Sequence, residues 1–403
     1  MFALEIPFTD NHAERLLTLF ELERFTNDGS PSGHTFLKSS STPTTAWHGL
    51  PDFPLPILRG IQRREYGDSS SLASIGLESG TECPVHPDCI HLTGHQMLPN
   101  NEYWRQLRVA PTSSPRVVVA LPERRFALKL HYPRILGRFD RPLLGEQLQF
   151  GVDVSQHFVA QDFVNSEFFP EIYTAEYSIS MFGANASEQS YGFLIRDLQP
   201  ISLSEIEWAV PAFSILAQRN LGLLRRPLLE DIVKWVGVKT KLGFICDCFL
   251  PTLCDSISEL VVVAGVWPEI TAQNFYFSKT KNGLFKIIWR DFQGCFVDLE
   301  LLNTSGYCGP LINYSYHSIA PGGIQWRSYL FDDVFGHHLI SPILRIFSHQ
   351  SDRIAIIKVL QERIKNSGLV DLLPVNAYAM KKRAPRKNER LELYSLPKPI
   401  WRP

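Results

Sequence analysis

The stretch WPEITAQNFYFSKTKNGLFKIIWRDFQGCFVDLELL, residues 267–302, places an amide and a carboxylate beside two strand-like segments. The runs FYFS (275–278) and LFKIIW (284–289) are rich in aromatic and β-branched residues, and the Lys-Asn-Gly between them predicts a hairpin turn. Such a hairpin would hold Asn274 and Asp291 side by side at neighbouring strand ends. Their side chains offer hard oxygen ligands, which suit the Mg²⁺ that carries a nucleotide's phosphates.

A simpler interpretation of the same residues stays open at this point. Asn274 could cap a local turn, and Asp291 could form a surface ion pair with Arg290, the residue before it in the chain. The spacing alone favours this simpler interpretation, because short polar residues at strand ends are common.

Composition limits the classes of protein to consider. A chain of 403 residues with 44% hydrophobic and 20% charged residues can bury a large core and should form two or three lobes. Its net charge of −1 gives no support for a nucleic-acid or membrane partner. The N-terminus lacks a signal-peptide pattern, and the apolar runs are too short to span a bilayer. Seven cysteines without a CxxC pair argue against a disulfide framework and a zinc ribbon, so we expect a cytoplasmic protein.

The hydrophobic pattern predicts an α+β protein with strands before helices. RVVVALP (116–122) and RFALKLHY (125–132) predict a second hairpin, and YGFLIRDL (191–198) predicts a further strand. The Ser-x-x-Glu at 202–205 resembles a capping box, so we expect a helix to follow it, interrupted near Pro211. Residues 226–266 and 332–368 show apolar residues at helical spacing.

These patterns divide the chain into three predicted lobes. Residues 1–110 would form an N-terminal lobe with long loops, and residues 111–225 a central strand-rich lobe, to which the resemblance described below assigns ATP binding. Residues 226–403 would form a C-terminal helical lobe that carries the Asn274/Asp291 hairpin. The common nucleotide-binding and hydrolase motifs, such as the P-loop, G-x-G-x-x-G, G-x-S-x-G and H-E-x-x-H, are absent from the sequence.

Six short segments nevertheless occur in a recognisable order. They are ECPVHPDC (82–89), SSPRVVV (113–119), LKLHYPRILGRFDRPL (128–143), GFLIRDLQP (192–200), PEITAQN (268–274) and WRDFQG (289–294). In this order the chain resembles the NRPS-independent siderophore synthetases, the aerobactin-synthetase-like or IucA/IucC family, from about residue 80 onward. The resemblance implies a palm, fingers and thumb arrangement around a deep ATP-binding cleft. It also implies adenylation of a carboxylic acid, followed by attack of an amine or hydroxyl to form an amide or ester, as in siderophore-like or other secondary metabolism.

The resemblance also implies roles for individual residues. The residues that would assist catalysis are Arg116, Lys129 and His86; those that would bind ATP are Ser114, Arg116, Lys129, Arg141, Asn274 and Asp291; those that would contact the substrate are Arg196, Glu269, Thr271 and Gln273. Asn274 and Asp291 would hold Mg²⁺. These types suit the chemistry, because adenylation needs fixed cations and a metal ion to offset the charge that develops on the phosphates. No enzyme nucleophile is required, since the second substrate attacks the acyl-adenylate itself.

The sequence departs from the family pattern at four positions near the expected acid. Cys83 and Thr271 replace histidines, Ile90 replaces a lysine, and Gly137 replaces a threonine or serine. Because a tricarboxylate needs several fixed donors, we expect an acid with fewer charges than citrate. The expected partners are thus a small carboxylic acid and an amine or alcohol, with a homodimer left open.

Two other classes of function stay open. The departures would permit a degenerate family member that binds a metabolite or partner without catalysis. The Asn274/Asp291 pair would equally suit a kinase-like phosphotransferase, since such sites hold Mg²⁺ with an Asn and an Asp.

Overall fold

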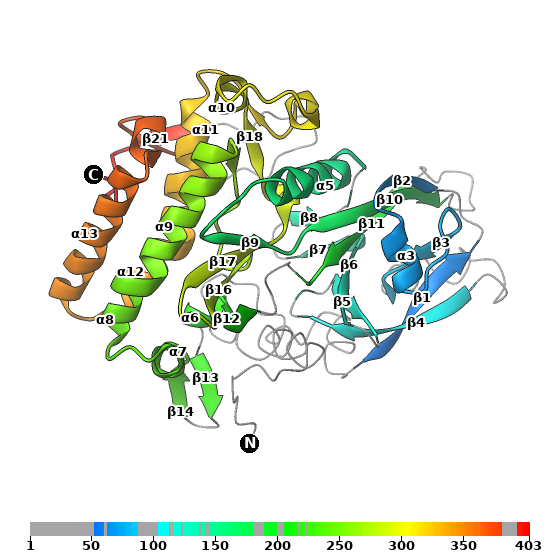
Figure 1. The fold of residues 1–403 in the computed structure, drawn as a ribbon, viewed down its shortest axis with the longest axis horizontal. Coiled ribbons are helices and arrows are strands. Elements are labelled where there is room, and N and C mark those ends of the chain that lie inside the picture. Colours follow the sequence, from blue (N-terminus) through cyan, green and yellow to red (C-terminus); the bar gives the residue numbers. More distant parts are fainter. Residues whose placement is uncertain are drawn as a thin grey trace.

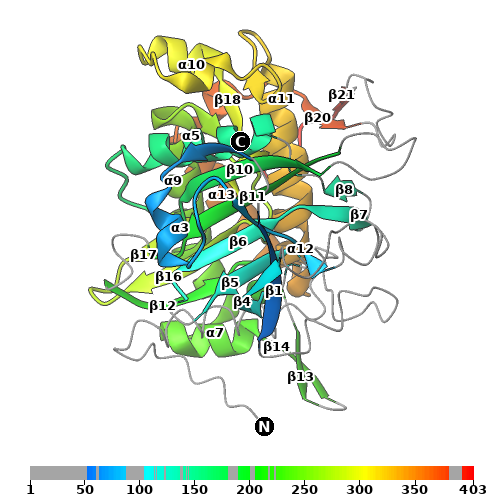
Figure 2. The same cartoon turned by 90° about the vertical axis from the view of Figure 1, so that its right-hand side faces the viewer.

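A large antiparallel sheet forms one half of the molecule and a helical layer the other (Figures 1 and 2). The computed structural model describes residues 52–59, 63–87, 104–112, 114, 116–121, 124–136, 139–141, 143, 145–179, 189–199, 205–216, 218–221, 224–380 and 393–403. The large sheet has the order β2 (Arg63–Gly67), β10 (Glu171–Ile179), β11 (Gln189–Asp197), β6 (Phe126–Leu130), β5 (Val117–Ala120), β4 (Trp104–Pro111), β1 (Phe53–Arg59), β3 (Glu82–Pro84). The α+β class expected from the sequence is confirmed.

The two edges of this sheet curl towards each other around an apolar core. The Tyr177 hydroxyl on β10 donates to the carbonyl of Pro84 on β3 at 3.2 Å. Glu65 on β2 accepts a hydrogen bond at 2.6 Å from the backbone N–H of Gly80, just before β3. The short helix α3 (Ser70–Ser74) contributes Leu72 to the same core.

The hairpin expected around Lys-Asn-Gly is the centre of a second sheet. This sheet has the order β12 (Ile206–Pro211), β16 (Phe275–Thr280), β17 (Phe285–Trp289), β9 (Ser166–Phe168). The strands β16 and β17 pair antiparallel, and the turn between them contains Gly283 with φ +86°, a conformation that glycine adopts at low cost. The hairpin of β5 with β6 and the strand β11 are confirmed as well.

The helix expected after residue 202 is wrong. Residues 206–211 form strand β12, which pairs with β16, and only α6 (Phe213–Leu216) is helical. The sequence IEWAVP contains β-branched and aromatic residues, and all but Glu207 are buried. Burial on both faces of a sheet outweighs the capping-box signal before it.

The helices form mainly in the C-terminal part, as the periodicity predicted. They are α7 (Leu229–Val236), α8 (Lys241–Gly243), η4 (Phe244–Phe249), α9 (Leu250–Ser258), η5 (Glu259–Val263), α10 (Leu299–Thr304), α11 (Ile324–Ser328), η8 (Tyr329–Ile340), α12 (Ser341–Ile346) and α13 (Gln350–Asn366). The short segments η7 (Pro310–Asn313) and η9 (Leu369–Leu372) are 3₁₀ turns, whereas η4, η5 and η8 are π-helical. In the part of the chain described, no helix combines the length and apolar character needed to cross a bilayer.

Four smaller sheets complete the fold of the residues that the structure describes. They are β7 (Tyr132–Leu136) with β8 (Phe139–Arg141), β13 (Gln218–Leu221) with β14 (Leu224–Pro227), β15 (Val266–Trp267) with β18 (Phe296–Asp298) and β19 (Ser318–Ile319), and β20 (Ala377–Met380) with β21 (Leu393–Leu396).

Helix α5 (Gly145–Val159) joins the large sheet to the helical half (Figure 1). Its Leu148 packs with Leu194 of β11, while Phe150 and Phe158 belong to the large C-terminal core. The sheets also cross the predicted lobe boundaries. Strand β4 contains residue 110, the first predicted boundary, and pairs with β1 on one side and β5 on the other. Strands β9 and β12 precede residue 225, the second boundary, and pair with β17 and β16, which follow it. The three-lobe division therefore stays a prediction about folding units, because the sheets themselves are shared.

Asp298 connects several elements of the C-terminal half. Its carboxylate, which is fully buried, accepts hydrogen bonds from Arg327 at 2.6 and 2.9 Å and from the Trp267 indole at 3.1 Å. It also caps the start of α10 through the N–H of Leu301.

We expect Asp298→Ala to lower the free energy of unfolding by about 3–5 kcal/mol, because it leaves the buried guanidinium of Arg327 without that carboxylate. Urea denaturation at pH 7 measures the loss. The control is Glu207→Ala, which removes a pair with Lys279 from a carboxylate that is 44% exposed and should cost less than about 1 kcal/mol. Equal losses in the two variants would contradict the role given to Asp298.

Candidate functional site

The site begins where the hairpin of β16 and β17 ends. Asn274 precedes β16 and Asp291 follows β17 by two residues, with Phe275 paired to Trp289. The N–H of Arg290 donates to the carbonyl of Asn274 at 2.9 Å, so both polar residues leave the same end of the sheet, as the sequence predicted.

Asp291 adopts a left-handed backbone conformation, with φ +69° and ψ +54°. Non-glycine residues seldom do so, although Asp tolerates this region better than most. The chain turns at this residue into the 3₁₀ segment η6 (Phe292–Gly294). The carboxylate thereby faces the large sheet.

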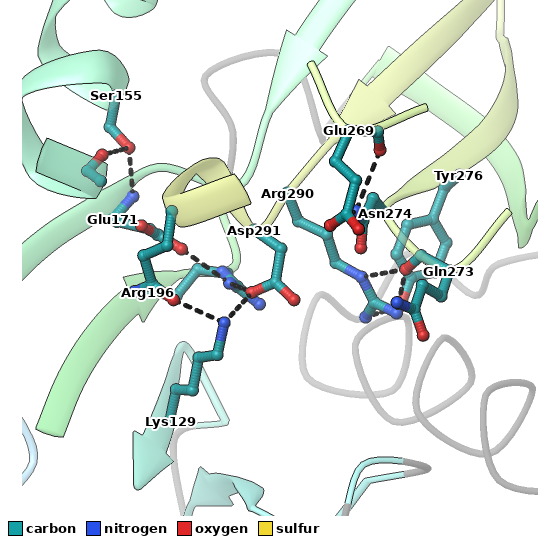
Figure 3. A network of polar contacts seen from close by, with 12 residues as sticks. Lys129, Ser155, Glu171, Arg196, Glu269, Gln273, Asn274, Tyr276, Arg290 and Asp291 are labelled. Carbon is teal, nitrogen blue, oxygen red and sulfur yellow. Dashed lines mark hydrogen bonds and ion pairs between the residues drawn. The ribbon is translucent and has the colours of Figure 1, made fainter. Parts of the chain in front are cut away.

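Two cations from the large sheet converge on Asp291 (Figure 3). The Lys129 ammonium donates to Oδ1 at 2.7 Å, and the Arg196 guanidinium donates to the same oxygen. Lys129 on β6 pairs with Leu194 on β11, so Lys129 and Arg196 lie diagonally on one face of adjacent strands. Three residues that the sequence assigned to ATP, metal and substrate are therefore in direct contact.

Each of these cations has a second partner that the sequence did not suggest. Arg196 donates to Glu171 Oε1 at 2.9 Å, and Lys129 donates to Gln293 Oε1 at 2.6 Å. Gln293 lies in the WRDFQG segment and could have been suspected from it, whereas Glu171 begins an ordinary strand and has no such signal. With Lys129, Arg196, Glu171 and Asp291 ionised, the cluster is formally neutral.

A second group of polar contacts lies next to this cluster (Figure 3). The Asn274 amide donates to Glu269 Oε2 and to the Glu269 carbonyl, both at 3.0 Å. Arg290 donates to the backbone carbonyl of Gln273 at 2.8 and 2.6 Å and to the Tyr276 hydroxyl at 3.1 Å. Asp291 is thus more than one half of a surface pair, because its carboxylate binds Lys129 and Arg196, while the nearby charge of Arg290 also lowers its pKa.

Burial and charge act in opposite directions on the ionisation of the cluster. Burial lowers the pKa of Lys129 to about 8, and the nearby charge of Arg116 contributes to that lowering while Asp291 opposes it. Burial alone would raise the pKa of Asp291, but Lys129 and Arg196 hold it well below its usual range. Burial raises the pKa of Glu171, against the opposing effect of Arg196.

The remaining predicted ATP ligands come from the turn before β5 and from β8. Half-buried Arg116 precedes β5, its carbonyl accepts from Leu130 N–H at 2.7 Å, and its charge acts on Lys129. The backbone N–H of Ser114, in the preceding turn, donates to Thr112 Oγ1 at 3.1 Å. Arg141 ends β8, and its side chain lies outside the described residues.

The other predicted residues differ in their surroundings. His86 is buried with its ring edge-on to Tyr132 at 4.9 Å. The Thr271 hydroxyl is buried and has no hydrogen-bond partner in the described part of the chain. Cys83 packs inside the core of the large sheet, and Ile90 and Gly137 lie outside the described residues.

A bound Mg²⁺ would need oxygen ligands from the side chains around Asp291. No group of three or more His, Cys, Asp or Glu side chains suited to a metal occurs among the described residues. Both cations bind Asp291 through Oδ1, which leaves Oδ2 of this 31% exposed side chain as a candidate ligand. Mg²⁺ typically takes one or two protein oxygens together with substrate phosphates, so Asp291 Oδ2 fits an ion that arrives with a nucleotide. Asn274 is buried and donates to Glu269, and its oxygen as a second ligand stays a prediction.

Comparison with known proteins identifies the fold. No family model and no curated protein matches the sequence. Among solved structures, the petrobactin biosynthesis protein AsbB from Bacillus anthracis str. Sterne aligns with a TM-score of 0.72 and 14% identity, covering 94% of this chain and 74% of that one. The chain has the fold of the NRPS-independent siderophore synthetases.

Two further structures of this kind support the same fold. Aerobactin synthetase IucA from a hypervirulent pathotype of Klebsiella pneumoniae aligns with a TM-score of 0.61 and 12% identity, covering 91% of this chain and 76% of that one. The ATP-bound form of IucA aligns with a TM-score of 0.60 and 14% identity over 82% of this chain and 66% of that one.

We expect Asp291→Ala to destabilise the protein by roughly 3 kcal/mol at pH 6, because Lys129 and Arg196 lose a shared carboxylate. The loss should shrink at pH 9.5, where folded Lys129, with a pKa of about 8, is mostly neutral. Urea denaturation at the two pH values measures both effects.

In the unsubstituted protein, the same lowered pKa makes the free energy of unfolding rise with pH. Unfolded Lys129 keeps its proton up to its ordinary pKa of 10.5, whereas the folded form loses it near 8. The unfolded state thus binds more protons in this window, and Lys129 adds stability as the pH rises through it. A loss in Asp291→Ala that is equally large at pH 6 and pH 9.5 would contradict the pairing with Lys129.

Proposed function

We propose that this protein is an ATP-dependent ligase that adenylates a carboxylic acid and joins it to an amine or a hydroxyl. The observation that carries the proposal is the convergence of Lys129 and Arg196 on Asp291, with Arg116 nearby, in this fold. Two cations that meet at one carboxylate, with the charge of Arg116 acting on one of them, suit a polyphosphate. One structure of similar fold is that of aerobactin synthetase IucA bound to ATP, which supports nucleotide binding by a protein of this fold.

The balance of charge supports an anionic ligand. Lys129, Arg196, Arg116 and Arg290 lie in or beside the site, against the carboxylates of Glu171, Asp291 and Glu269. The depressed pKa of Lys129 means that its charge is only partly compensated in the ligand-free protein. Phosphate oxygens beside Lys129 would restore that compensation, and Mg²⁺ on Asp291 Oδ2 would offset the charge of the leaving pyrophosphate.

The proposed reaction has two steps. A carboxylate oxygen of the acid attacks the α-phosphorus of ATP, and pyrophosphate leaves with the electron pair of the broken P–O bond. The amine or hydroxyl then attacks the acyl carbon, AMP leaves, and the proton of the nucleophile passes to solvent. Fixed donors matter most in the first step, where charge develops on the phosphates.

The other predicted residues keep their roles as part of this proposal. Ser114 and Arg141 would contribute to nucleotide binding, and His86 would assist catalysis. Glu269, Thr271 and the half-buried Gln273, whose backbone carbonyl binds Arg290, would lie towards the acid. The Thr271 hydroxyl is short and neutral, and Cys83 is enclosed in the core, so neither supplies a cation for a tricarboxylate. We therefore propose an acid with fewer charges than citrate.

A screen of pyrophosphate release over mono-, di- and tricarboxylic acids, with a panel of amines and alcohols, tests this reaction. We expect AMP and pyrophosphate as products, with a less charged acid preferred to citrate. Lys129→Met should lower the rate on the order of 10²-fold, because it removes a donor to the reacting phosphates. The exposed-pair variant Glu207→Ala should keep the wild-type rate.

The products separate this proposal from its alternatives. ADP would indicate a phosphotransferase, and the absence of nucleotide turnover with every acid and nucleophile would favour a binding protein. Citrate as the best acid by a wide margin would contradict the inference from Thr271 and Cys83 while leaving the ligase itself in place.

Nucleotide binding should also be accompanied by proton uptake. Lys129 has a pKa of about 8 in the ligand-free protein, and nearby phosphates would raise it. At pH 8 we therefore expect about half a proton to be taken up for each Mg·ATP bound. Calorimetry in buffers of different ionisation enthalpy measures this number.

The control for proton uptake is Lys129→Met, which has no ammonium to titrate. Subtracting its proton count removes the contribution of the nucleotide's own phosphates. Equal uptake by the two proteins would show that Lys129 does not meet the phosphates.

A further inference from the structure

Each cation of the site has one shared partner and one partner of its own. Asp291 is shared by Lys129 and Arg196, whereas Glu171 binds Arg196 and Gln293 binds Lys129. If Asp291 binds a metal ion through Oδ2, its one negative charge serves the ion and both cations together. Glu171 is then the carboxylate that Arg196 shares neither with Lys129 nor with the ion.

Glu171 is built into the structure on the side of Arg196 away from Asp291 (Figure 3). Its side chain is fully buried, and its N–H donates at 2.8 Å to the Ser155 hydroxyl, which in turn donates to the carbonyl of Gly151 at 2.9 Å. A Cβ on Gly151 would lie 2.1 Å from Glu171 Oε2. The carboxylate can therefore occupy this position only because helix α5 has a glycine opposite it.

We propose that Glu171 is a positioning residue, which holds Arg196 directed at the bound phosphates while Asp291 also binds the metal ion. The proposal rests on the nucleotide-binding function given above. Glu171 is too deeply buried to touch the nucleotide itself, so it acts through Arg196. Gly151 takes part indirectly, because it leaves space for the carboxylate.

Charge and positioning predict opposite effects of Glu171→Gln. Removing a buried negative charge beside a polyanion site should, through charge alone, tighten binding of Mg·ATP. Loss of the carboxylate that fixes Arg196 should instead weaken it, because the guanidinium must then be ordered when the nucleotide binds. We expect the second effect to dominate, with the Kd rising about 10-fold.

Gly151→Ala tests the same contact without changing any charge. An alanine in a helix is ordinarily favourable, but here its Cβ would displace the Glu171 carboxylate, at 2.1 Å, and press more weakly on Gln293 Cγ, at 3.0 Å. We expect the Kd for Mg·ATP to rise about 10-fold. The matched control is Gly243→Ala in α8, where the added Cβ would lie 3.1 Å from the Thr240 hydroxyl and 3.5 Å from Asp247 Oδ2, and where the Kd should stay at the wild-type value.

A third variant separates positioning from general loss of structure. Arg196→Met should weaken Mg·ATP binding about 10-fold in the wild-type background but less than about 3-fold in the Glu171→Gln background. A merely structural role for Glu171 would make the two substitutions additive. Calorimetry with Mg·ATP, and with Mg·pyrophosphate as a second probe, measures all of these constants.

The outcomes distinguish the two proposals. If the wild-type protein binds neither probe, the nucleotide-binding function fails and positioning fails with it. If the wild type binds while Glu171→Gln and Gly151→Ala bind as tightly or more tightly, positioning is overturned and nucleotide binding stands. If Glu171→Gln does not fold, Gly151→Ala decides.

Discussion

The contact on which the site depends is the shared bond of Asp291 Oδ1 with Lys129 and Arg196. Two cations that are about 95% buried cannot face each other without carboxylates to offset their charges. Asp291 offsets them from the second sheet and Glu171 from the large sheet itself. The buried charges therefore hold the two sheets together as well as forming a site.

This arrangement explains why Asp291, which follows strand β17, has a left-handed backbone conformation. A residue that continued the alternation of β17 would project from a face of the second sheet, whereas Asp291 turns out of the strand towards β6 and β11. The backbone strain at Asp291 is tolerated because ion pairs on one side and segment η6 on the other determine its position.

Those parts of the fold that depend on local pattern could be predicted from the sequence. The hairpin of β16 and β17 follows from two β-rich runs around a Lys-Asn-Gly turn, and the C-terminal helices follow from their periodicity. Strand β12 could not be predicted in this way, since its sequence after a Ser-x-x-Glu is ambiguous and pairing with β16, more than 60 residues later, decides it. Long-range pairing overrides local signals at this point.

The same limit applies within the site. Lys129, Arg196 and Asp291 could be named from their segments, because each belongs to a pattern that carries the resemblance. Glu171 could not, since its function depends on a glycine one helix away and on a strand pairing that places Arg196 beside it. A carboxylate at the start of a strand is ordinarily exposed, and only the missing side chain at Gly151 lets this one lie buried against Arg196. Residues that bind a ligand can thus be recognised from sequence, whereas residues that position them emerge only from the packing.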